Sequence, residues 1–129
     1  MKRLLILPVF SVLALTVCFS CSHFRHRHNI SISQSESDDG LYQVTAYFNE
    51  SQTKKLQRYI NECIKPNALF GSGNVAFDAT TTLDDRTRFY IKFLPGELKI
   101  KIDKYQNSAE SYAMIKKMGQ GVKEVLKGD

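Results

Sequence analysis

From residue 41 onward, the hydrophobic positions of the chain follow two different spacings. Polar and apolar residues alternate, or β-branched and aromatic residues dominate, along residues 41–48, 74–83, 87–94 and 97–103. Such stretches are typical of strands with one buried face. The sequence therefore predicts four strands in this part of the chain.

Helical spacing appears in two places. After the potential caps Asn49 and Ser51, apolar residues recur every three or four positions until Lys65-Pro66, and this stripe contains Leu56, Tyr59, Ile60, Cys63 and Ile64. After Asn107 or Ser108, a second stripe contains Tyr112, Ile115, Met118, Val122, Val125 and Leu126. Each stripe gives a helix one apolar face, which must pack against another element.

The predicted order is β-α-β-β-β-α. Two helices can cover one face of a four-stranded sheet, so we expect a two-layer α+β sandwich with a mostly antiparallel sheet. Residues 41–129 are enough chain for one such domain. The other face of the sheet is then left to solvent or to a partner.

The turns predict which residues lie on that open face. Pro95-Gly96 suits a type II turn, and residues 84–86 suit a three-residue loop. The resulting register places Lys92 opposite Lys99 and Arg88 opposite Asp103, and it sets Asp78, Thr80 and Thr82 beside Lys92, Tyr90 and Arg88. Each inward pair of the last two strands is then apolar, and these residues point outward: Asp78, Thr80, Thr82, Arg88, Tyr90, Lys92, Lys99, Lys101 and Asp103. Arg88, Tyr90, Lys92, Lys99 and Lys101 are the candidate binding residues, for an anionic partner. A solvated face of alternating charge explains the same residues.

The start of the chain has a different pattern. Met1-Lys2-Arg3 is basic, and residues 4–17 are apolar or small without a charge. This stretch is shorter than the about 20 residues of a membrane-spanning helix. A basic start, a short apolar stretch and small residues after it are the parts of a secretory signal peptide, which we assign to residues 1–20.

The sequence Val17-Cys18-Phe19-Ser20-Cys21 resembles the lipobox of bacterial lipoproteins. It departs from that pattern at Cys18, where leucine is usual, and Cys18 itself is the alternative acceptor. The resemblance implies that Cys21 becomes the first residue and carries acyl chains such as palmitate, which anchor the protein to a membrane. Ser22 is not the aspartate that retains many such proteins at the inner membrane, so the resemblance favours the outer membrane.

Lipidation would leave Cys63 as a buried thiol, whereas without it a Cys21–Cys63 disulfide becomes possible. The histidines His23, His26 and His28 alternate with arginines, and this indicates a basic tether near lipid headgroups rather than a metal site. The remainder of residues 21–40 is polar and predicts a flexible tether.

The charge balance is mild, with 18 Lys and Arg against 13 Asp and Glu and a net charge of +5. It does not indicate nucleic-acid binding. Residues 41–129 contain no histidine, and Asp84 and Asp85 are adjacent in a turn, so we expect no enzyme, no cofactor and no metal.

We therefore expect a lipid-anchored protein of the bacterial envelope, whose small periplasmic or surface domain binds an envelope protein or supports assembly of a complex. One alternative is a module that binds anionic glycan or lipid through the basic sheet face. Another is an accessory lipoprotein of a secretion system such as type VI, which is similar in layout. A hydrolase with unusual residues is the remaining alternative.

Overall fold

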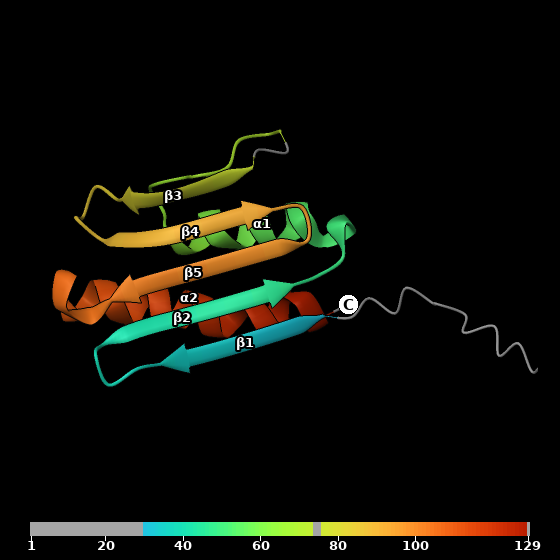
Figure 1. Ribbon diagram of the computed structural model, residues 1–129. Helices are drawn as coiled ribbons and strands as arrows, with labels where there is room; N and C mark the ends of the chain where they lie inside the picture. The colour runs from blue at the N-terminus through green and yellow to red at the C-terminus, as the bar shows by residue number, and fades with distance from the viewer. Residues whose placement is uncertain (1–29, 74–75, 129) are drawn as a thin grey trace, which may run out of the picture.

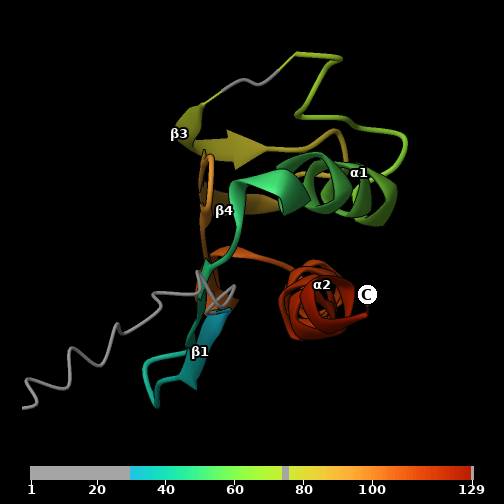
Figure 2. The same cartoon turned by 90° about the vertical axis from the view of Figure 1, so that its right-hand side faces the viewer.

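A computed structural model describes residues 30–73 and 76–128. Over these residues the chain forms a five-stranded sheet, two α-helices and two short 3-10 helices. The strands lie in the order β1-β2-β5-β4-β3, and all neighbours are antiparallel (Figure 1). Helices α1 and α2 cover the same face of the sheet (Figure 2). The predicted α+β architecture with both helices on one face is confirmed.

The four predicted strands and two predicted helices are all present, with small changes at their ends. In chain order the elements are β1 (Ser31–Glu36), β2 (Leu41–Tyr47), η1 (Glu50–Gln52), α1 (Thr53–Cys63), β3 (Phe77–Thr82), β4 (Arg88–Leu94), β5 (Glu97–Asp103), η2 (Lys104–Gln106) and α2 (Ala109–Lys127). Asn49 caps η1 by accepting from the backbone N–H of Ser51 at 2.8 Å. Ser108 caps α2 by accepting from that of Ser111 at 3.0 Å.

The predicted register is confirmed over most of its length. In the β3–β4 ladder, Asp78 lies opposite Lys92, Thr80 opposite Tyr90 and Thr82 opposite Arg88. The β4–β5 ladder runs from Leu94 opposite Glu97 to Tyr90 opposite Lys101, and there it ends. The backbone of Arg88, which we expected to face Asp103, is bound instead by the Asn107 side chain: its Oδ1 accepts from the Arg88 N–H at 2.8 Å and its Nδ2 donates to the Arg88 carbonyl at 2.9 Å.

The prediction of four strands, and with it the β-α-β-β-β-α order, was wrong by one strand. Residues 21–40 were assigned to a flexible tether, but Ser31–Glu36 form the edge strand β1, which pairs with residues 42–47 of β2. A turn closed by Gly40 joins the two strands, and Gly40 adopts φ +79°, a conformation that glycine reaches without steric cost. The reason for the error is that only Ile32 supplies an apolar side chain toward the helices from within β1.

Hydrogen bonds take the place of apolar contacts along β1. Gln34 Oε1 accepts from the Tyr42 hydroxyl at 3.1 Å. Glu36 accepts from the Tyr112 hydroxyl at 2.6 Å and from Lys116 Nζ at 2.5 Å. Since Tyr112 and Lys116 belong to α2, these bonds fasten the edge strand to the helical layer.

The Glu36 contacts predict an acid-sensitive attachment of β1. The hydrogen bonds from Lys116 and then Tyr112 lower the pKa of Glu36 below its usual 4.5. Because the folded pKa is the lower one, the stabilisation is fully present above the unfolded pKa and is lost as pH falls through the folded pKa. We expect the urea midpoint of the protein to fall below about pH 4.5, and to fall less in Glu36→Gln, when both are measured from pH 7 to pH 2. If the urea midpoints of the wild type and of Glu36→Gln fell equally with pH, this role of Glu36 would be contradicted.

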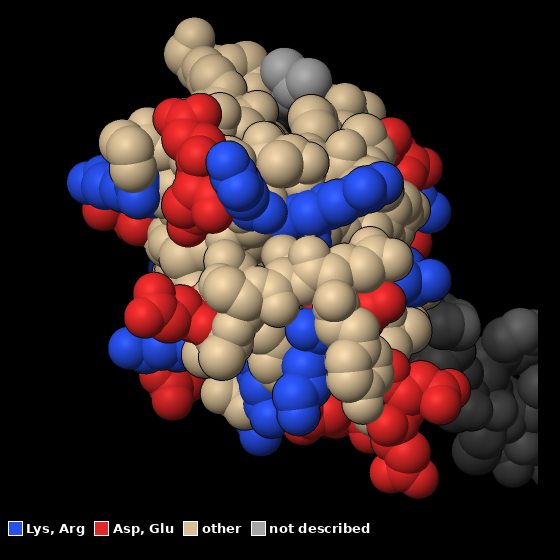
Figure 3. Space-filling view, turned by 90° about the vertical axis from the view of Figure 1, so that its left-hand side faces the viewer, with Lys and Arg blue, Asp and Glu red and all other residues tan. Residues whose placement is uncertain are grey.

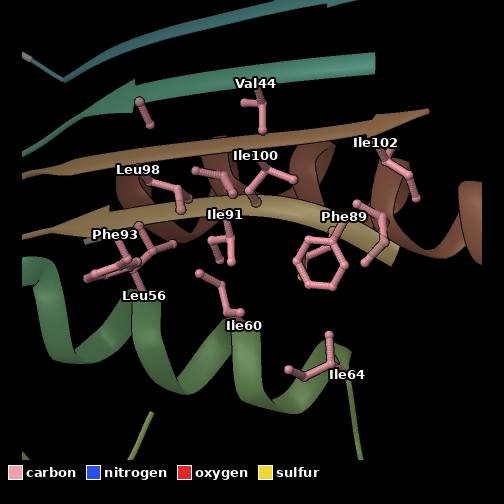
Figure 4. Close-up of a cluster of buried hydrophobic side chains, with 14 of the residues drawn as sticks. Val44, Leu56, Ile60, Ile64, Phe89, Ile91, Phe93, Leu98, Ile100 and Ile102 are labelled. Atoms are coloured by element: carbon pink, nitrogen blue, oxygen red, sulfur yellow. The ribbon is translucent and has the colours of Figure 1, made fainter. Parts of the chain in front are cut away.

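The core lies between the sheet and the helices. Leu56 and Ile60 of α1, and Ile64 directly after it, point at the inward side chains of β4, as Figure 4 shows. The largest fully buried side chains come from every element of the two layers except the edge strands β1 and β3: Tyr42, Phe89, Phe93, Leu56, Ile60, Ile64, Ile91, Leu98, Ile100, Ile102, Ile115 and Met118. All inward residues of β4 and β5 are buried, so a shift by one residue would expose them, and the register was predictable for this reason.

Two glycines in α2 allow tyrosines to approach the helix closely. A Cβ on Gly119 would lie 2.6 Å from the Tyr42 hydroxyl oxygen, and one on Gly121 would overlap the Tyr59 hydroxyl. The Tyr59 hydroxyl donates to the Met118 carbonyl at 2.8 Å, and burial raises the pKa of Tyr59. Glycine costs helix stability, so its presence here is explained by this close packing.

The signal peptide, the lipidation site Cys21, and His23, His26 and His28 lie outside the described residues. In the part of the chain that is described, neither helix combines the length and the apolar character needed to cross a membrane.

Candidate functional site

The open face of the sheet carries the candidate binding residues. Arg88, Tyr90 and Lys92 alternate along β4, and Lys99 and Lys101 alternate along the neighbouring β5. Between them lie buried residues that point to the helices. The structure therefore brings all five predicted residues together on two adjacent strands. Arg88 is exposed, and the other four are partly buried by their neighbours.

Three of these five residues have partners within the face itself. Lys92 Nζ forms an ion pair with Glu97 Oε1 at 3.2 Å. The Tyr90 hydroxyl donates to Asp78 Oδ1 at 2.7 Å, and this hydrogen bond raises the pKa of Tyr90. Lys101 Nζ lies 5.7 Å from the centre of the Tyr90 ring, within the range of a cation–π contact. These contacts hold Tyr90 between two strands in one orientation.

Lys99 and Arg88 are in a different position. Lys99 lies opposite Lys92 on one side and Thr45 on the other, so a like charge and a hydroxyl are its direct neighbours in the sheet. Over residues 30–73 and 76–128, no carboxylate forms an ion pair with Lys99 or with the Arg88 guanidinium. The face thus keeps two cations that an outside anion could reach.

A shallow depression of about 180 Å³ lies where the face meets η2. It is lined by Leu41, Thr80, Arg88, Phe89, Tyr90, Lys101, Asp103 and Gln106. Figure 3 looks onto this end of the molecule, where basic side chains are interspersed with acidic ones. The depression combines an aromatic ring, an exposed leucine, two cations and the Asp103 carboxylate. This mixture suits a protein side chain or a small anionic group more than an extended polyanion.

Three exposed apolar side chains were not among the predicted binding residues. Leu41 and Tyr47 lie at the two ends of β2 on the open face, with 37 and 49 % of their surface exposed. Tyr105, on η2, is 75 % exposed, and its ring lies against Gly40. Their outward position followed from the alternation along residues 41–47, since Tyr42, Val44 and Ala46 are the buried ones. Tyr105 had no such signal, because it lies outside the strands.

The groups considered for catalysis do not converge. Cys63 is partly buried, and burial raises the pKa of its thiol, which disfavours the reactive thiolate. The Asp85 carboxylate accepts from the Thr87 backbone N–H at 3.0 Å, and its contacts with Thr87 lower its pKa. A carboxylate with a lowered pKa is a poor general base or acid near neutral pH. Among the described side chains, no group of three or more His, Cys, Asp and Glu is placed to hold a metal ion.

We compared the chain with protein-family models, with curated proteins and with solved structures, and none of the three comparisons gives a match.

Proposed function

We propose that this chain is a lipid-anchored protein of the bacterial envelope, without enzymatic activity, whose domain binds a partner protein through the open face of its sheet. The lipobox-like sequence ending at Cys21 supports the anchor. The face described above supports the binding role. Its chemistry is that of recognition, since a held aromatic ring, an exposed leucine and two cations adjoin one another.

The position of β1 supports an orientation for the anchored domain. β1 begins at Ser31, opposite Tyr47, whereas Leu41, Arg88 and the depression lie at the other end of the strands. Residues 22–29 join Cys21 to Ile30, so these two Cα atoms can lie at most about 30 Å apart. A membrane attached at Cys21 would therefore approach the Ser31 end and leave the depression facing outward.

The observation that carries the binding role is the position of Lys99. Two lysines directly opposite each other destabilise an antiparallel pair. The charge of Lys92 is balanced by its ion pair with Glu97, but no described carboxylate pairs with Lys99. An acidic partner surface would complete this arrangement. We infer that the partner presents Asp or Glu side chains to Lys99 and Arg88 and packs an apolar residue against Tyr90.

The substitution Lys99→Glu is expected to change stability and partner binding in opposite directions. The new carboxylate would face Lys92 across the sheet, so we expect the free energy of unfolding to rise by about 0.2–1 kcal/mol. Capture of the partner from solubilised envelope membranes is expected to fall about tenfold or more, because an attractive charge becomes a repulsive one. The measurements are urea denaturation and quantitative mass spectrometry of proteins retained by the immobilised full chain.

The matched control is Lys117→Glu, which makes the same charge change at an exposed position of α2, on the other side of the sheet. It is expected to retain the partner. If both variants retain the same proteins as the wild type, the open face is not the binding surface.

The alternative of an anionic glycan or lipid ligand uses the same cations and is supported by Arg88 and Lys101 at the depression. It predicts that retention weakens steeply with salt and that no protein is enriched. The alternative of an accessory lipoprotein of a secretion system predicts that components of one such system are retained together.

A further inference from the structure

A second concave site lies on the helical layer, between α1 and the chain that follows it. The cleft has a volume of about 280 Å³ and is lined by Lys54, Gln57, Arg58, Asn61, Phe70, Gly71 and Ser72. Four of these residues lie on three successive turns of α1. Neither the proposed anchor nor the proposed sheet-face partner makes use of this site, because α1 lies on the opposite side of the sheet (Figure 2).

The wall opposite the helix is held in place. Asn61 Oδ1 accepts from the backbone N–H of Leu69 at 2.9 Å and of Phe70 at 3.2 Å, and Asn61 Nδ2 donates to the Phe70 carbonyl at 2.8 Å. The Phe70 ring packs 4.8 Å from the Phe93 ring, centre to centre, and is 6 % exposed. The Phe70 side of the cleft is therefore held against α1 and β4.

Gln57 contributes a polar group that the fold leaves without a partner. Its side chain is 5 % exposed, and its Nε2 makes no hydrogen bond to any described residue. An unpaired buried amide group costs free energy, typically about 1–3 kcal/mol. Gln57 also lines the cleft, so a rotation of its side chain toward the cleft would let an acceptor bound there satisfy the NH₂ group.

The two charged residues that line the cleft are both basic. Lys54 and Arg58 are four residues apart on α1, so their side chains leave the same side of the helix, and both are exposed. Like charges at this spacing destabilise a helix. None of the seven lining residues is Asp or Glu. An anion between Lys54 and Arg58 would remove the repulsion and accept from the Gln57 amide.

We propose that this cleft binds a small oxyanion, a carboxylate or a phosphate group. Arg58 offers a planar pair of N–H donors, Lys54 a single charge and Gln57 a neutral donor below them. The Phe70 side of the cleft would contact the carbon atoms of a short acid. The volume is enough for one such group with a few carbons and not for a polymer.

The test is a titration of the ¹⁵N-labelled full chain in neutral detergent micelles, followed by ¹H–¹⁵N NMR. Inorganic phosphate and glutarate are added in separate experiments, each against sodium chloride at equal ionic strength. We expect one or both to give saturable shifts of the Gln57 side-chain amide and of the Gly71 backbone amide. Saturation by phosphate alone, or by glutarate alone, identifies which oxyanion the cleft takes.

The double variant Lys54→Gln/Arg58→Gln is expected to weaken this binding about tenfold or more, since two charge-assisted contacts are lost. Lys104→Gln, which removes one charge from η2 outside the cleft, is expected to bind like the wild type. Shifts that sodium chloride reproduces in the wild-type protein, or that are unchanged in the double variant, would overturn the proposal. Because the sheet face is untouched, retention of a partner protein is unaffected by either result.

Discussion

Replacing Phe93 with alanine is expected to lower the free energy of unfolding by about 3–5 kcal/mol. Phe93 is fully buried on β4, opposite Leu98, and its ring lies 4.8 Å from that of Phe70 and 6.1 Å from that of Phe48. It therefore joins the sheet to the segments on both sides of α1. Alanine would leave a cavity that these rigid aromatic neighbours cannot fill. The free energy of unfolding of a domain of this size is about 5–15 kcal/mol in total, so the substitution would remove much of its stability.

Urea denaturation followed by circular dichroism measures this change. Phe93→Leu is the conservative comparison and is expected to lose clearly less, because most of the volume is kept. Tyr105→Ala removes an aromatic ring that is 75 % exposed and is expected to change stability by about 0.5 kcal/mol or less. Equal losses in Phe93→Ala and Tyr105→Ala would contradict the described core.

Gly121→Ala is expected to destabilise the protein by about 1–3 kcal/mol, although alanine is the better helix former by about 1 kcal/mol. The added methyl group would overlap the Tyr59 hydroxyl, so the ring must move and give up its hydrogen bond to the Met118 carbonyl. This contact fixes the distance between α1 and α2. The loss should be visible as a lower urea midpoint.

A double-mutant cycle isolates the cause. In a Tyr59→Phe background the hydroxyl is absent, and the nearest ring atom would lie 3.0 Å from the new Cβ. Gly121→Ala is then expected to cost little or to stabilise. Gly71→Ala is the matched control at a position where a Cβ meets no atom within 4 Å. An undiminished cost of Gly121→Ala in the Tyr59→Phe background would show that the close approach of Tyr59 is not the reason for the glycine.

The central strands could be predicted from the sequence because each has one fully buried face. In β4 and β5 every second residue is buried, so a shift of one position would expose Phe89, Ile91 or Ile100. The same alternation predicts Lys92 opposite Lys99, and the structure confirms this pair. Helices α1 and α2 were predicted from their apolar stripes, and the cap Ser108 of α2 is confirmed. The cap predicted for α1 was wrong, because Asn49 caps η1 and α1 begins after Gln52 without a side-chain cap.

The edge strand β1 could not be recognised in this way. Its inward positions include Gln34 and Glu36, which are satisfied by tyrosine hydroxyls from β2 and α2. A tyrosine can bury its ring in the core and extend its hydroxyl to a polar strand, and the sequence of β1 alone contains no trace of this arrangement. The short alternation of Ile30 and Ile32 and the Gly40 turn were the available signals.

The residues of the candidate binding face could be predicted from the sequence, but the contacts among them could not. The strand register determines which residues point outward. The ion pair of Lys92 with Glu97 joins residues that are diagonal neighbours on β4 and β5, so it depends on the side-chain conformations. Because that pair exists, the repulsion expected between Lys92 and Lys99 falls mainly on Lys99. The cleft beside α1 could not be foreseen either, since it needs Phe70 to be folded back onto Asn61.

The most direct test of a lipid-anchored binding domain is mass spectrometry of the intact protein purified from its native membranes. We expect a chain that begins at Cys21 and carries acyl chains on that residue, with Cys63 as a free thiol. A chain that retains residues 1–20 and has an unmodified thiol at Cys21 would contradict the proposed anchor, and with it the envelope location and the orientation of the domain.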